Sequence, residues 1–159
     1  MPARDVIRLR PVNADDTPFL CLVYASTREE ELSRVPWTDE QKAAFILHQF
    51  HAQKTHYEDA YSNADFQVIE VEGQPAGRLY IYRQDDLIHV IDIALLPAFR
   101  HQGIGTMLFR ELQDEGRSTN KAVEIYVENF NPAHQWYERM GFEHVDTNGL
   151  YHLMKWRPA

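Results

Sequence analysis

Two glycines two residues apart, followed by an amphipathic helical pattern, form the stretch of this sequence best suited to bind an anion. Gly103 and Gly105 lie in a basic turn that runs from Arg100 to Thr106. Glycine lets the backbone approach a ligand closely and adopt conformations that a side chain would forbid. The main-chain amides of Gln102 to Thr106 would lie unpaired at a helix N-terminus, where the helix dipole favours negative charge. With the Arg100 guanidinium beside them, these amides predict a pyrophosphate-binding turn.

The neighbouring residues predict the two elements that position this turn. Residues 87–96 are apolar except for His89 and Asp92, which is typical of a strand covered on both faces, and Pro97 ends it. After the turn, apolar residues repeat at helical spacing, and Gly116 is placed to end that helix. Strict alternation along the strand would place His89 on the same face as Ile91, Ile93 and Leu95, and Asp92 on the other.

The rest of the chain predicts alternating strands and helices without a linker or repeat. A strand is expected at 6–10, and helices follow within 13–35 and 38–61, the second opened by a Thr38–Gln41 capping box. A hairpin is expected from 66–72 and 77–82, then a strand at 122–127, a short helix closed by Gly141, and a last hairpin within 144–156. At 159 residues the chain is predicted to form a single domain, residues 1–159.

Two motifs in order along the chain resemble those of the GCN5-related N-acetyltransferases, the GNAT family. Residues 100–105, RHQGIG, resemble its R/Q-x-x-G-x-G/A signature. Residues 127–133 and 136–142, VENFNPA and WYERMGF, resemble its N-x-x-A and LYEKLGF segments, with Asn131 one residue nearer to Tyr137 than in the commonest version. The resemblance implies an α+β fold: a mostly antiparallel, splayed sheet of about seven strands flanked by about four helices.

The resemblance further implies that the chain binds acetyl-coenzyme A and transfers its acetyl group to an amine of a small molecule or peptide. The turn would hold the pyrophosphate, the preceding strand would pair with the pantetheine amides, and Asn131 would touch the thioester region. The residues implied in cofactor binding are Ile93, Ala94, Leu95, Arg100, His101, Gln102, Gly103, Ile104, Gly105, Thr106, Asn131 and Ala133.

Direct attack by a neutral amine needs a proton acceptor and a donor for the departing thiolate. Tyr137 fits the donor role by its place in the resemblance, although its apolar neighbours also allow a core tyrosine. His89 is the candidate base, because histidine titrates near neutral pH and because its place resembles that of a catalytic glutamate in histone-type relatives. A water-mediated route weighs equally, and the further candidates are Asp92, Glu70, Glu72, Tyr80 and Tyr82.

Composition narrows the classes of partner. The net charge of −8 argues against nucleic acid and suits a neutral or cationic acceptor. No apolar run reaches the roughly 18 residues of a membrane span, and nothing at the N-terminus resembles a signal peptide. A single cysteine, Cys21, fits a reducing compartment, so a cytoplasmic location is expected. Trp136, Trp156 and the terminal strands are candidates for a homodimer interface.

One group of residues is set aside, and alternatives stay open for a second group and for the function of the whole chain. His48, His51 and His56 lie close together but lack a ligand-like spacing of carboxylates or cysteines, so no metal site is predicted. The charged segment 27–35 is read as a solvated helix face, with an acidic rim for an amine as its functional alternative. For the whole chain, the alternatives to an enzyme are a non-catalytic acyl-coenzyme A-binding or regulatory module and a nucleotide-binding domain; the missing lysine disfavours the latter.

Overall fold

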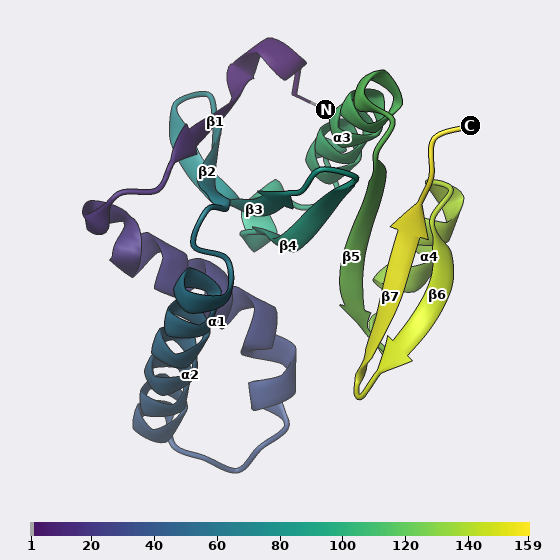
Figure 1. Cartoon of the computed structure of the whole chain (residues 1–159). Helices are drawn as coiled ribbons and strands as arrows, with labels where there is room; N and C mark the ends of the chain where they lie inside the picture. The colour runs from purple at the N-terminus through teal and green to yellow at the C-terminus, as the bar shows by residue number, and fades with distance from the viewer. Residues whose placement is uncertain (1) are drawn as a thin grey trace.

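The computed structural model describes residues 2–159, and its centre is one mixed sheet of seven strands (Figure 1). The strand order is β1-β2-β3-β4-β5-β7-β6, and every neighbouring pair is antiparallel except β4 and β5. The strands are β1 (Ile7–Pro11), β2 (Asp65–Val71), β3 (Gln74–Arg83), β4 (Leu87–Leu95), β5 (Ala122–Glu128), β6 (Glu143–Asn148) and β7 (Tyr151–Trp156). The predicted fold class is confirmed.

Four α-helices accompany the sheet: α1 (Thr17–Ser33), α2 (Asp39–Ala60), α3 (Ile104–Thr119) and α4 (Ala133–Arg139). Helices α1 and α2 pack together through a small core that includes Leu20, Ile46 and Phe50. The main core lies between the sheet and the helices α3 and α4, with Phe109 fully buried at its centre. Figure 1 shows α1 and α2 together at one side of the molecule, away from α3 and α4. Short 3-10 turns occur at Arg4–Val6, Ala14–Asp16 and Pro97–Phe99.

The ends of two helices test the sequence signals directly. The capping box of α2 is confirmed, because the Thr38 hydroxyl accepts from the Gln41 amide and the Gln41 side chain accepts from the Thr38 amide. The predicted end of α3 at Gly116 is wrong, since the helix continues to Thr119 and Asn120 takes the left-handed conformation. A Cβ on Gly116 would lie 2.6 Å from the Lys121 carbonyl oxygen, so this glycine serves a close approach instead of a helix end.

The two halves of the sheet separate at the only parallel pair of strands. Pairing between β4 and β5 runs from Leu87–Ala122 to Val90–Ile125 and then stops, although both strands continue. The remaining residues of β4 and β5 diverge, as Figure 1 shows. The predicted splayed sheet is therefore confirmed, and the divergence leaves one edge of β4 open.

A β-bulge in β4 overturns the predicted alternation of its side chains. Tyr80 pairs with Asp92 but Ile81 pairs with Val90, which leaves Ile91 as an extra residue. The extra residue shifts the alternation, so His89 and Asp92 both face the end of α2, where they contact Tyr61 and Tyr57 respectively. Ile93 and Leu95 instead pack against the main core. The predicted opposition of His89 and Asp92 was wrong because it assumed an uninterrupted strand.

Two further observations bear on partners. Trp156 is buried in the main core beside Gly116, so it offers no surface to a second chain. Between residues 2 and 159 no helix combines the length and the hydrophobicity needed to cross a membrane.

Candidate active site

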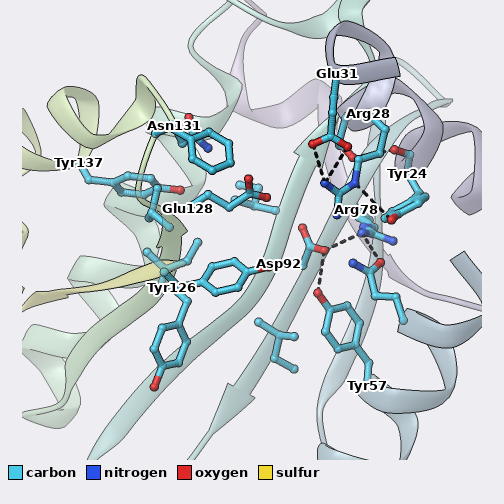
Figure 2. A pocket seen from close by; sticks show the side chains of 18 of the residues that line it. Tyr24, Arg28, Glu31, Tyr57, Arg78, Asp92, Tyr126, Glu128, Asn131 and Tyr137 are labelled. Carbon is cyan, nitrogen blue, oxygen red and sulfur yellow. Dashed lines mark hydrogen bonds and ion pairs between the residues drawn. The ribbon is translucent and has the colours of Figure 1, made fainter. Parts of the chain in front are cut away.

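A cavity of about 1360 Å³ opens where β4 and β5 diverge. One wall carries Ile91 and Ile93 of β4, and the other carries Tyr126 and Glu128 of β5. Helices α1 and α2 close the cavity on a third side (Figure 2). From Ile93, β4 continues through the short Pro97–Phe99 turn to the predicted anion site at Arg100–Thr106, whose residues do not themselves line the cavity.

The turn before α3 has the backbone geometry of an anion site. His101 and Gly103 both take positive φ, at 61° and 79°. None of the main-chain amides from His101 to Thr106 has a hydrogen-bond acceptor within residues 2–159. A Cβ placed on Gly105 would meet nothing within 4 Å, so the space above the turn is open. Free amides, a helix N-terminus and open space together fit a pyrophosphate.

The side chains of the turn have other partners. The Arg100 guanidinium donates to the Leu95 carbonyl over 2.8 Å and to the Ser26 hydroxyl over 3.2 Å. Gln102 donates to the Ala98 carbonyl, and the Thr106 hydroxyl accepts from the Trp136 indole. Arg100 thus secures the end of β4 against α1, and the main-chain amides are the groups left free for an anion.

The open edge of β4 presents the main-chain groups of alternate residues. The Leu96 amide donates to the Ala76 carbonyl of the neighbouring segment. In an antiparallel ladder this places the polar groups of Ala94 toward β3 and those of Ile93 and Leu95 toward the side that β5 has left. Ile93 can therefore pair with an extended ligand, and Leu95 can do so through its amide, since its carbonyl already accepts from Arg100. Ala94 is engaged with Arg78 of β3.

Tyr137 lies on the far side of the cavity from α2. Its ring is packed against Phe109, Trp136 and Phe142, and the residue is only 6% exposed. Its hydroxyl nevertheless points into the cavity (Figure 2). Burial, together with the negative charge of Asp92, raises the pKa of the Tyr137 phenol, so the group stays protonated at neutral pH. The arrangement suits a proton donor.

The turn into α4 brings the second predicted motif beside Tyr137. Asn131 lines the cavity, and its side-chain oxygen accepts from the Ala133 amide over 2.9 Å. That bond fixes the start of α4. Ala133 itself packs against the main core. Gly141 closes the helix at φ 93°, and the Phe142 amide donates to the Tyr137 carbonyl, as the sequence predicted for this end.

His89 lines the closed end of the same cavity, and its partner was not foreseen from the sequence. Its Nδ1 lies 2.8 Å from Oε2 of Glu124 on β5. Burial alone would raise the pKa of Glu124, but the hydrogen bond from His89 and the charges of His89 and Lys155 bring it below its usual range. In the sequence, Glu124 is an ordinary polar residue of a strand with alternating apolar and polar positions, so nothing marks it as a partner of His89. The contact between them becomes evident only from the register of β4 and β5.

A second buried polar group on the α2 side was also missed. Arg78 of β3 pairs with Asp92 over 2.6 Å and with Gln53 over 2.8 Å, and the Tyr57 hydroxyl donates to the same Asp92 oxygen. Burial and the charge of Asp92 raise the pKa of Tyr57. The Nε of Arg78 is buried without a partner among the residues described. The one signal in the sequence was a charged residue inside an otherwise apolar strand.

The charged segment of α1 forms part of the cavity wall. Thr27, Arg28, Glu30, Glu31 and Arg34 all line it. Arg28 pairs with Glu31 and donates to the Tyr24 hydroxyl (Figure 2). Arg34 pairs with Glu30. The side chains of Arg34 and Glu30 are 75% and 84% exposed, as expected of a solvated helix face, and the acidic rim stays a prediction. Over residues 2–159 no three His, Cys, Asp or Glu side chains are grouped so that they could hold a metal ion.

Comparison with known proteins identifies the family. The sequence model of the Acetyltransferase (GNAT) family matches residues 24–142. A Bacillus subtilis protein described as a candidate ribosomal protein bS18-alanine N-acetyltransferase is 34% identical over 103 residues, which span 58% of this chain and 68% of that protein. An N-alpha-acetyltransferase of Sulfurisphaera tokodaii is 33% identical over 67 residues, 40% of each chain.

Solved structures agree at the level of the fold. The PaiA N-acetyltransferase of Thermoplasma acidophilum, solved with coenzyme A, superposes with a TM-score of 0.71 over 95% of this chain and 98% of that chain, at 18% identity. The chain belongs to the GNAT acetyltransferase family. It is an N-acetyltransferase whose cosubstrate is acetyl-coenzyme A, and the free amides and the open edge of β4 fit that cosubstrate.

Proposed function

We propose that the chain acetylates the terminal α-amine of a peptide or protein. The names of the two relatives in sequence support a polypeptide acceptor. The mouth of the cavity supports it too, because Phe130 is 70% exposed and Tyr151 is 43% exposed there. Large apolar side chains left in solvent at the rim of a polar cavity are typical of a surface that receives another chain.

The observation that carries the proposal is the position of the Tyr137 hydroxyl, which opens into the same cavity as the exposed edge of β4. We assign the amides of His101 to Thr106 to the pyrophosphate, and the main-chain groups of Ile93 and Leu95 to the pantetheine arm. Asn131 lines the cavity together with Tyr137, whereas Ala133 packs against the main core and would act only through the hydrogen bond from its amide to Asn131. In this assignment the Arg100 guanidinium does not contact the ligand. It donates to the Leu95 carbonyl and so holds in place the end of β4.

The proposed chemistry uses two side chains of the cavity. When bound, acetyl-coenzyme A supplies a thioester whose carbonyl carbon can be attacked by an amine. Nε2 of His89 takes one proton from the acceptor ammonium and passes it to solvent. The neutral nitrogen then forms the C–N bond while the C–S bond breaks. Tyr137 gives its proton to the departing sulfur and regains one from the acceptor nitrogen, so the products are an amide, a thiol and one released proton.

A peptide screen tests this function. Purified protein is incubated with acetyl-coenzyme A and a set of hexapeptides that differ in the first residue, and thiol release is recorded with mass spectrometry of the products. Matched peptides with a blocked N-terminus are the control. We expect a gain of one acetyl group on free N-termini and none on blocked ones. Acetylation confined to lysine side chains or to free polyamines would contradict the acceptor class, and absence of thiol release with every amine would leave a binding module.

A homodimer and a cytoplasmic location remain further predictions. Because Trp156 is buried, the candidates left for a dimer interface are Trp136 and the terminal strands, of which β6 is an exposed edge of the sheet.

A further inference from the structure

His89 and Glu124 form a buried pair at the closed end of the cavity. The two residues are register partners across the parallel strands β4 and β5, and their exposed fractions are 5% and 8%. One step further along, at Val90 and Ile125, the pairing of the strands ends. The pair therefore lies just before the point where the sheet opens, and the carboxylate reaches the histidine only because this short stretch of parallel pairing exists.

The hydrogen-bond chemistry of the pair assigns the tautomer of His89. A carboxylate can only accept, so the Nδ1–Oε2 contact of 2.8 Å requires the proton on Nδ1. In the neutral ring the lone pair then lies on Nε2. This nitrogen has no protein partner in the part of the chain that is described, and it is not sealed from the cavity that His89 lines. The nitrogen that can take a proton is thus the unpartnered Nε2, on a ring that lines the cavity.

Neighbouring side chains hold both members of the pair in place. Tyr61 stacks on the His89 ring at 5.7 Å and 20°, and Tyr126 meets it edge-on at 5.8 Å. The second oxygen of Glu124 lies 3.5 Å from Nζ of Lys155 on β7. The lowered pKa of Glu124 keeps it charged at neutral pH. A fixed negative charge beside Nδ1 stabilises the imidazolium that forms when Nε2 accepts a proton.

We propose that Glu124 is a positioning residue for acetyl transfer: it holds His89 as the Nδ1-protonated tautomer, directs Nε2 into the cavity and stabilises the ring when it takes the proton from the acceptor ammonium. The inference rests on the proposed role of His89 as the base. It adds a residue that makes no contact with the reacting atoms and acts through its hydrogen bond to the ring.

Two variants of Glu124 separate geometry from charge. Glu124→Gln keeps the size and an acceptor oxygen but removes the charge, whereas Glu124→Ala removes both. The tautomer of His89 is read by two-bond ¹H–¹⁵N spectra of the full chain with coenzyme A added, so this measurement does not depend on the acceptor. We expect the Nδ1–H tautomer in the unaltered protein and a mixture, or mainly the Nε2–H form, in Glu124→Ala.

Kinetics with the best peptide of the screen supply the second measurement. We expect kcat to fall about 10- to 100-fold in Glu124→Ala and less in Glu124→Gln, with the KM for acetyl-coenzyme A unchanged. In a chain that already carries His89→Ala, the further change Glu124→Ala should have almost no effect on kcat, because the two residues act as one unit. Thermal unfolding of each variant identifies any that fails to fold, and Glu143→Ala on the exposed strand β6 is the matched control.

The outcomes distinguish the two proposals. An unchanged tautomer in a folded Glu124→Ala protein overturns the positioning role, whatever happens to the rate. A changed tautomer combined with full activity of His89→Ala overturns the assignment of His89 as the base, and the positioning role for catalysis falls with it. Additive losses in the double variant show that Glu124 acts independently of His89, and they also overturn the inference.

Discussion

Arg78 and Asp92 form an ion pair 2.6 Å apart across β3 and β4, and the arginine side chain is only 3% exposed. Two charges taken out of water are held by each other and by Gln53 and Tyr57. Removing one partner leaves the other charge buried without compensation, which costs far more than the pair contributes. The pair forms part of the cavity wall.

We therefore expect Asp92→Ala to lower the free energy of unfolding by about 3 kcal/mol, because Arg78 then stays buried and unpaired. The double variant Arg78→Met with Asp92→Ala should recover much of this loss, since neither charge remains. Urea unfolding of the three proteins measures both effects. An Asp92→Ala protein with the same free energy of unfolding as the parent would show that water reaches Arg78 freely.

Tyr137→Phe tests the proton donor without disturbing the core. The ring contacts with Phe109 and Phe142 do not involve the hydroxyl. We expect kcat to fall about 100-fold or more while KM and the melting temperature change little. Because burial raises the pKa of this phenol, the donor should not be lost as the pH rises to 10, the usual value for tyrosine. Unaltered kcat in the phenylalanine variant would remove Tyr137 from the mechanism.

The features that could be predicted are those encoded by residues close together in the chain. Gly103 and Gly105 mark their turn, and Asn131 and Gly141 mark the ends of the helix that carries Tyr137, so local chemistry was enough to place them. The bulge at Ile91 depends on pairing with β3, and the contact between His89 and Glu124 depends on the register of two strands joined through α3. Neither leaves a local signal. For the same reason His89 was predicted on the wrong face of β4, together with Ile93 and Leu95 instead of with Asp92.

The pair of Arg10 and Asp16 provides a prediction for the pH dependence of stability. The guanidinium of Arg10 donates to both oxygens of Asp16 over 2.7 and 2.8 Å, and this bond lowers the pKa of Asp16 in the folded chain below its usual 3.8. The folded state therefore binds this proton more weakly than the unfolded state does. The resulting stabilisation is present above the unfolded value and is lost as the pH falls through the lowered folded value.

We expect Asp16→Asn to be less stable than the parent at pH 7, and the difference to shrink below about pH 4, where the parent carboxyl also becomes neutral. Urea midpoints between pH 7 and pH 2 measure it. Asp15→Asn, one position away and exposed, is the matched control and should show no comparable trend. A difference that stays constant down to pH 2 would mean that shape, and not charge, accounts for the loss.

Gly105 offers the sharpest test of the anion site, because a large acidic side chain there should block the ligand without straining the fold. Gly103 is less useful, since its φ of 79° is itself unfavourable for any other residue. At Gly105 a Cβ meets nothing within 4 Å, so Gly105→Ala should fold normally and keep most of its affinity for acetyl-coenzyme A. Gly105→Glu places a bulky negative group over the free amides. We expect millimolar acetyl-coenzyme A to raise the melting temperature of the parent and the alanine variant, and to leave that of the glutamate variant unchanged. An equal rise in all three proteins would mean that the phosphates bind elsewhere, and the assignment of the cavity would then have no anchor for its ligand.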